Sequence, residues 1–268
     1  AIRLAARRIA RFQEHIRYRS PPDIREDGIR LAHRVIPLSS AGFYCPGGIG
    51  GEHPLVASVL MNAGPARVAG VRRLVMATPP RRDGGVNPAL LAAAREAGID
   101  EIYAVGGAQA IGMLAYGTES VRPVDMIAGP GNAFVALAKK AVQDVCRVDM
   151  VAGPSEVAII ADASANPTWI AWDLLAQAEH APGSSVLVTT SRRLAVSVAR
   201  EAARAAAVVD RGEALAECLR SLCFIAVVPT LARAVALVEE LAPEHLEIAV
   251  RNPRVLARGI RTAGACFL

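Results

Sequence analysis

Short apolar runs alternate with longer amphipathic stretches along most of this chain. Mostly apolar runs of five or six residues occur at 73–78, 157–161, 185–189, 224–228 and 246–250. Between them lie segments in which apolar residues recur every three or four positions, as at 88–97, 133–145 and 231–241. The short runs predict buried strands, and the longer segments predict helices packed on them. Short glycine-bearing connections between them are typical of a parallel sheet covered by helices on both faces.

This alternation occurs in two successive series. It predicts an α/β fold made of two three-layer, Rossmann-like units with mostly parallel sheets, one at 44–154 and the other at 155–268. The segment 1–43 reads as an N-terminal helix, ended by Ser20-Pro21-Pro22, and an extended segment. We predict that residues 1–43 pack on the second unit.

Composition and charge place the chain among ordinary globular proteins. It has 268 residues, 53% of them hydrophobic and 21% charged, with 30 basic against 25 acidic side chains. The basic residues of the first thirty positions are interleaved with apolar ones at helical spacing, which predicts a surface helix rather than a nucleic-acid arm. No apolar run is long enough to span a membrane, and the start lacks a signal-peptide pattern. We therefore predict a soluble, cytoplasmic protein without nucleic-acid or membrane partners.

The five cysteines are odd in number and form no Cys-x-x-Cys pair. This spacing favours reduced thiols over a disulfide framework or a thiolate zinc site.

One polar motif, Gln177-Ala178-Glu179-His180, ends a predicted helix that begins at Pro167, with Asn166 as its cap. In that helix Asp173, Gln177 and His180 share one face, opposite an apolar stripe. An imidazole with an oxygen ligand one turn away can fill two positions on a divalent metal such as zinc. The alternative is a solvated helix end whose histidine interacts with the helix dipole.

A second polar motif, Pro243-Glu244-His245-Leu246-Glu247, lies where a helix ends and a strand begins. A carboxylate beside an imidazole can supply an acid and a base for successive proton transfers. An ordinary pair of loop residues is the alternative.

Glycine-containing turns follow predicted strands at 46–48, 106–109, 129–132 and 153–156. At the carboxyl ends of parallel strands, such turns let backbone N–H groups approach a phosphate or ribose. The dinucleotide fingerprint Gly-x-Gly-x-x-Gly is absent, because the stretch that begins like it at Gly129 has Phe134 in the last position.

Six motifs together resemble the histidinol dehydrogenase family. In chain order they are Tyr44-Cys45-Pro46-Gly47-Gly48, Val105-Gly106-Gly107-Ala108-Gln109-Ala110-Ile111, Gly129-Pro130-Gly131-Asn132-Ala133, Ala152-Gly153-Pro154-Ser155-Glu156, Gln177-Ala178-Glu179-His180 and Pro243-Glu244-His245-Leu246. The resemblance implies an intertwined homodimer of two-unit chains, in which zinc holds a small amino alcohol and NAD accepts hydride. The implied reaction oxidises L-histidinol to L-histidine through histidinal, the last steps of histidine biosynthesis, and uses two NAD.

The resemblance also implies roles for individual residues. Gln177 and His180 match two zinc ligands that also contact the substrate, and Ser155 matches a further substrate contact. His245 matches the base that removes the alcohol proton, and Glu244 matches the group that activates water against the aldehyde. The NAD-contacting positions of the family correspond to Tyr44, Gln109 and Asn132.

The chain departs from the family pattern at both ends. After Leu268, family members continue with an aspartate zinc ligand and a small C-terminal domain that brings a glutamate and a second histidine to the neighbouring subunit. The family's N-terminal helical extension is also shortened or absent. With two zinc ligands where a catalytic zinc has three, we expect this chain alone to bind zinc weakly and to turn over little substrate. A dehydrogenase of another small alcohol and a non-catalytic dimerisation module are the alternatives.

Overall fold

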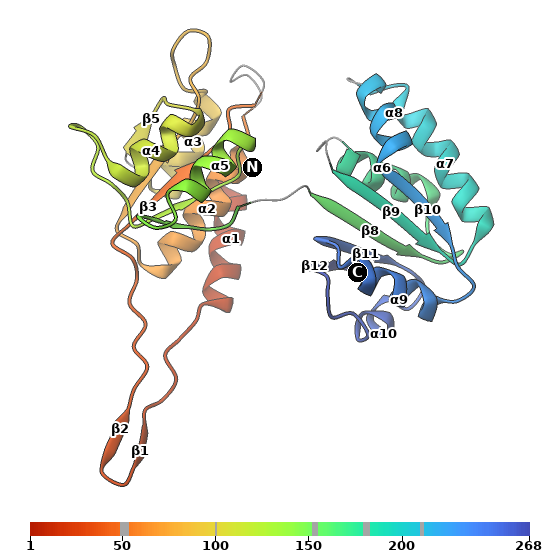
Figure 1. The fold of residues 1–268 in the computed structure, drawn as a ribbon, viewed down its shortest axis with the longest axis horizontal. Helices are drawn as coiled ribbons and strands as arrows, with labels where there is room; N and C mark the ends of the chain where they lie inside the picture. Colours follow the sequence, from red (N-terminus) through yellow and green to blue (C-terminus); the bar gives the residue numbers. More distant parts are fainter. Residues whose placement is uncertain (49–53, 100, 152–154, 179–182, 210–211) are drawn as a thin grey trace. The chain divides into compact units, whose positions relative to one another are not determined.

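The computed structural model of the protein describes residues 1–48, 54–99, 101–151, 155–178, 183–209 and 212–268, with 212–214 described by their backbone alone. The chain divides into two compact units, residues 1–152 and 153–268, and each has its own sheet (Figure 1).

The first unit is built on a five-stranded parallel sheet in the order β5-β4-β3-β6-β7. Its strands are β3 (Ser40–Tyr44), β4 (Arg73–Ala77), β5 (Glu101–Tyr103), β6 (Met126–Ala128) and β7 (Arg147–Val148). Its helices are α1 (Ile2–Ile16), α2 (Val56–Ala69), α3 (Pro88–Ala97), α4 (Gly107–Tyr116) and α5 (Ala133–Ala141). Alternate residues of one strand serve opposite faces, since Met76 packs with α2 and α3 while Val75 packs with α4 and α5. The predicted helix-sheet-helix layering is confirmed for this unit.

The N-terminal segment belongs to the first unit. Apolar residues of α1, including Ile2 and Ile9, pack into the cluster formed by α2 and α3, and Arg3 Nε donates to Glu96 Oε1 at 2.9 Å. Gly64 makes room for this packing, because a Cβ there would lie 2.7 Å from Ile9 Cγ2. The prediction that residues 1–43 pack on the second unit is therefore wrong, because the apolar face of α1 packs against α2 and α3.

A two-stranded antiparallel hairpin, β1 (Ile24–Glu26) and β2 (Ile29–Leu31), follows α1 and extends away from the rest of the first unit (Figure 1). Its two turn residues, Asp27 and Gly28, both have positive φ angles, of 51° and 80°. Such a turn matches the natural twist of a hairpin.

The second unit has a parallel sheet in the order β10-β9-β8-β11-β12. Its strands are β8 (Glu156–Ala161), β9 (Ser184–Thr189), β10 (Cys223–Val227), β11 (His245–Ala249) and β12 (Ala265–Phe267). Helices α6 (Pro167–Ala178) and α7 (Arg192–Ala206) cover one face, and α9 (Leu231–Leu241) and α10 (Pro253–Ala257) cover the other (Figure 1). The predicted parallel α/β architecture is thus confirmed here as well.

Helix α8 (Gly212–Ser221) packs against α6 and α7 and was not predicted from the sequence. The predicted cap of α6 is present, since Asn166 Oδ1 accepts a hydrogen bond from Thr168 N at 2.9 Å.

All five cysteines are free, as predicted. Within the described ranges, every helix is too short or too polar to cross a membrane.

Candidate active site

Several predicted site residues lie at the amino ends of the strands in the second unit. Helix α6 leaves the carboxyl end of β8 and returns to the amino end of β9, so Gln177, in its last turn, lies near that edge. His245 is the first residue of β11, and Ser155 directly precedes β8, which pairs with β11. The topology therefore gathers residues from three separate stretches of the chain.

Glu244 connects Ser155 with His245. Its Oε2 accepts a hydrogen bond from Ser155 Oγ at 2.7 Å and from Glu156 N at 3.4 Å. The same oxygen lies 3.6 Å from His245 Nδ1. Their side chains remain accessible to a ligand, with 49% of Glu244 and 38% of His245 exposed. Because Nδ1 is the nitrogen near the carboxylate, Nε2 is the one placed to receive a substrate proton.

Gln177 is buried, with only 8% of its surface exposed, and its Nε2 has no hydrogen-bond partner. Asp173, one turn earlier in α6, is exposed, whereas Gln177 is buried with its neighbour Ala178. A buried amide without a partner costs about 1–3 kcal/mol. Since amide oxygen and nitrogen are assigned from their bonding network, this end of the side chain fits a ligand site.

The second predicted zinc ligand, His180, lies outside the described residues. Among the residues that are described, there is no group of three or more His, Cys, Asp and Glu that could hold a metal ion. The donor chemistry of Gln177 therefore fits one position of a zinc site, and the described part of the chain does not complete the ligand shell.

A carboxyl pair lies next to these residues in chain order. Glu247 follows His245 by two positions on β11, and Asp173 precedes Gln177 by one turn of α6. The two carboxyl groups lie close enough for each to affect the pKa of the other. Two strand residues and one helical turn span similar distances, about 6 Å. Starting from the Asp173–Glu247 contact, Gln177 on α6 and His245 on β11 therefore lie about equally far toward the amino ends of the strands.

Burial raises the pKa of Glu247 to about 7, and the neighbouring Asp173 charge contributes further. The pKa of Asp173 is also raised, mainly by burial. The pair therefore holds a proton up to near-neutral pH. Glu247 was not among the predicted site residues. The alternation of Leu246 and Ile248, which pack with α9, could have placed it on the α6 face.

We expect Glu247→Gln to stabilise the protein above pH 7. The pKa of this carboxyl is about 7 when folded against an ordinary 4.5. The contribution of this carboxyl group to the free energy of unfolding is therefore fully present below pH 4.5 and is lost as the pH rises through 7. Such a pKa rise corresponds to about 3 kcal/mol for a fully buried group, reduced to about 1 kcal/mol for this half-buried one.

Urea unfolding between pH 4.5 and 8.5 measures this difference. The variant and the wild type should be about equally stable at the acidic end, diverge as the pH rises from 4.5 to 7, and keep a constant difference above pH 7. The exposed Glu240→Gln on α9 is the matched control. Parallel stability curves for Glu247→Gln and wild type across the whole range would contradict the assignment.

In the first unit, the predicted NAD-side residues lie at the carboxyl ends of strands. Tyr44 ends β3, is buried, and accepts a hydrogen bond on its hydroxyl from Gly107 N at 3.1 Å. Asn132 Oδ1 caps α5 by accepting from Val135 N at 3.1 Å, and its side chain is exposed. Gln109 is exposed in the first turn of α4. Tyr44 thus contacts the glycine turn that leads into the helix carrying Gln109.

The turn at Gly129 packs against the backbone of Tyr44. Gly129 has a φ angle of 114°, and a Cβ there would collide with Tyr44 O. Only glycine fits at this position. The structure therefore brings two of the predicted glycine turns together around one tyrosine.

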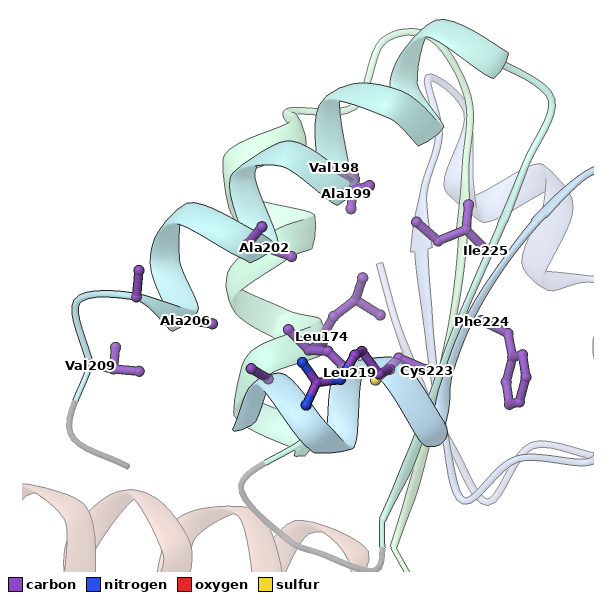
Figure 2. Close-up of a pocket in the computed structure, with 14 residues that line it drawn as sticks. Leu174, Val198, Ala199, Ala202, Ala206, Val209, Leu219, Cys223, Phe224 and Ile225 are labelled. Atoms are coloured by element: carbon purple, nitrogen blue, oxygen red, sulfur yellow. The ribbon is translucent and has the colours of Figure 1, made fainter. Parts of the chain in front are cut away.

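An apolar pocket of about 710 Å³ lies elsewhere in the second unit, among α6, α7, α8 and β10 (Figure 2). Leu174, Val198, Ala202 and Leu219 lie around it in Figure 2. Its described lining contains none of the predicted site residues and no carboxylate or imidazole. The predicted acid-base residues therefore lie outside this pocket, at the amino ends of the strands.

The motifs and the fold agree with comparisons against known proteins. The sequence model of the histidinol dehydrogenase family matches residues 1–268. The chain belongs to this family. It is 50% identical to a histidinol dehydrogenase of Rhodospirillum rubrum over 270 residues, which cover all of this chain and 61% of that relative. The corresponding protein of Nitratidesulfovibrio vulgaris is 48% identical over 268 residues, again covering all of this chain and 62% of that relative.

A solved family structure, histidinol dehydrogenase from Elizabethkingia anophelis, has the same fold. Its TM-score to this chain is 0.94 at 36% identity, over all of this chain and 61% of that one. The resemblance to the histidinol dehydrogenase family is therefore confirmed, and the chain spans about three fifths of the length of these relatives.

Proposed function

We propose that this chain provides the cofactor and substrate units of an enzyme that oxidises L-histidinol to L-histidine through histidinal, with NAD and zinc. The observation that carries the proposal is the Ser155–Glu244–His245 contact at one edge of the sheet, in a chain of the histidinol dehydrogenase family. As an enzyme of amino-acid biosynthesis it would act in the cytoplasm as a homodimer.

His245 is the proposed base. In each oxidation the substrate carbon loses a hydride and its hydroxyl group loses a proton, which His245 Nε2 accepts. The nearby Glu244 carboxylate orients the imidazole and stabilises the cation that forms. Ser155 keeps that carboxylate in place through its hydroxyl group.

Glu244 has a second proposed role between the two oxidations. A water molecule must add to the aldehyde before the second hydride can leave, and the half-exposed carboxylate can take the proton from that water. One site can therefore serve both oxidations, because His245 and Glu244 are accessible to solvent and can release to water the protons that they accept.

Gln177 and His180 would hold the zinc ion, and Tyr44, Gln109 and Asn132 would contact NAD. When bound, zinc would orient and polarise the amino alcohol, and NAD would accept the hydride. Two protein ligands are fewer than the three of a usual catalytic zinc site. We therefore expect the remaining ligands to come from parts of the protein beyond this chain and from the partner subunit.

Substrate choice distinguishes this proposal from a dehydrogenase of another small alcohol. We expect L-histidinol to bind the intact zinc-loaded protein at least about tenfold more tightly than an amino alcohol without the imidazole, because the ring offers zinc a nitrogen ligand. Competition of the two alcohols, measured by inhibition of NADH production, gives this ratio. Equal affinity for both alcohols would favour the alternative substrate class. Dimerisation without binding of zinc or NAD would instead support a non-catalytic module.

A further inference from the structure

A buried lysine lies beneath the cofactor side of the first unit. Among the residues whose side chains are described, Lys139 on α5 is the only buried Lys, Arg, Asp or Glu, with 4% of its surface exposed. Its Nζ donates to Gly129 O at 3.0 Å and to the carboxylate of Asp149. Lys139 therefore links a helix, a glycine turn and the residue that follows β7.

Asp149 completes the arrangement from the other side. Its Oδ2 accepts a hydrogen bond from Gly129 N at 2.8 Å, and its Oδ1 accepts from Met150 N at 2.7 Å. Both backbone polar groups of Gly129 are thus held by side chains of one ion pair. Gly129 lies between β6 and α5 and belongs to neither. Its backbone N–H and C=O therefore need partners other than those of a strand or a helix.

The geometry of α5 explains how a lysine ten positions away reaches this turn. Helical side chains point back toward the helix N-terminus, so a lysine in the last turn of α5 lies along the helix toward its start. The turn at 129–132 is there, and Gly129 lies against Tyr44 in a conformation that only glycine adopts easily. The ion pair therefore fixes the turn and, with it, the position of Asn132.

Packing alone does not account for a lysine at this buried position. Taking its ammonium group out of water costs several kcal/mol, while its partner Asp149 keeps 27% of its side chain exposed, and apolar side chains of similar volume often replace such buried charges without loss of stability. A role in fixing one backbone conformation does account for it. We propose that Lys139 and Asp149 are positioning residues that hold the Gly129–Asn132 turn in the shape that binds NAD. This inference rests on the proposed function, which assigns Asn132 to the NAD side.

Titration of the 268-residue chain with NADH, followed by the fluorescence of the nucleotide, tests the inference. Lys139→Met and Asp149→Asn are expected to raise the Kd for NADH about tenfold or more, which corresponds to about 1.4 kcal/mol. The matched control is Lys140→Met, which removes the exposed neighbouring lysine of the same helix and should leave the Kd unchanged.

The double variant Lys139→Met/Asp149→Asn separates positioning from stability. It leaves no unpaired buried charge, so its thermal midpoint should recover relative to the single variants, while its Kd for NADH stays raised. If a single variant does not fold, the Kd for NADH of the double variant still tests the inference. Recovery of both stability and affinity would show that the pair is only structural and overturn the inference.

Two further outcomes distinguish the inference from the proposed function. Failure of the wild-type chain to bind NADH would contradict the NAD role itself, and the inference with it. Tight NADH binding by the wild type, both single variants and the double variant alike would overturn the inference alone.

Discussion

Replacing His245 by asparagine in the intact enzyme is expected to slow both oxidation steps by at least about 100-fold, the usual contribution of a positioned general base. Asparagine retains hydrogen-bonding capacity but cannot accept the substrate proton. Because one imidazole serves both steps in the proposed mechanism, kcat measured with histidinol and kcat measured with histidinal should fall together. The Kd for NADH should stay unchanged.

The control for this variant is His15→Asn, which replaces an exposed histidine of α1 in the first unit. It should retain full activity. Turnover of His245→Asn within a few fold of the wild type would exclude His245 as the base. Loss of only one of the two steps would show that the oxidations use different bases.

Replacing Gln177 by methionine is expected to separate zinc binding from stability. Methionine has a similar length and shape but lacks the amide. Zinc affinity of the intact protein should fall at least about 100-fold, since even residues outside the ligand shell can contribute 10- to 100-fold. The metal-free protein should become more stable by about 1 kcal/mol, because the buried amide nitrogen has no hydrogen-bond partner without a ligand.

Zinc titration and urea unfolding in a chelator measure these two effects. The exposed Thr168→Val at the start of α6 is a control for changes in the helix that do not reach the site. A Gln177→Met variant that binds zinc normally would remove Gln177 from the ligand set. Destabilisation of the metal-free variant would show that the amide has a structural partner.

The regular part of the fold was predictable because each sheet is parallel and covered on both faces. Strands such as β4 and β8 are then almost wholly apolar, and the helices between them are amphipathic, so local pattern determines both. The packing of α1 was not predictable in this way. Its apolar face has the same pattern whichever unit it packs against, and the space at Gly64 that receives Ile9 appears only in three dimensions.

The candidate site was predictable in its residue types and less so in its contacts. The adjacency of Glu244 and His245 is local, but the bond from Ser155 to Glu244 joins residues 89 positions apart. It depends on the pairing of β8 with β11, which no local pattern fixes. The same holds for Asp173 with Glu247, which needs α6 to lie over β11, and for Gln177, whose helix buries more than one face.

The most direct test of the proposed reaction is the ratio of NADH formed to L-histidinol consumed by the intact zinc-loaded protein. Two oxidations at one site predict two NADH and one L-histidine for each L-histidinol, and removal of zinc with a chelator should abolish both. One NADH with accumulation of histidinal, or no NADH from L-histidinol at all, would contradict the account.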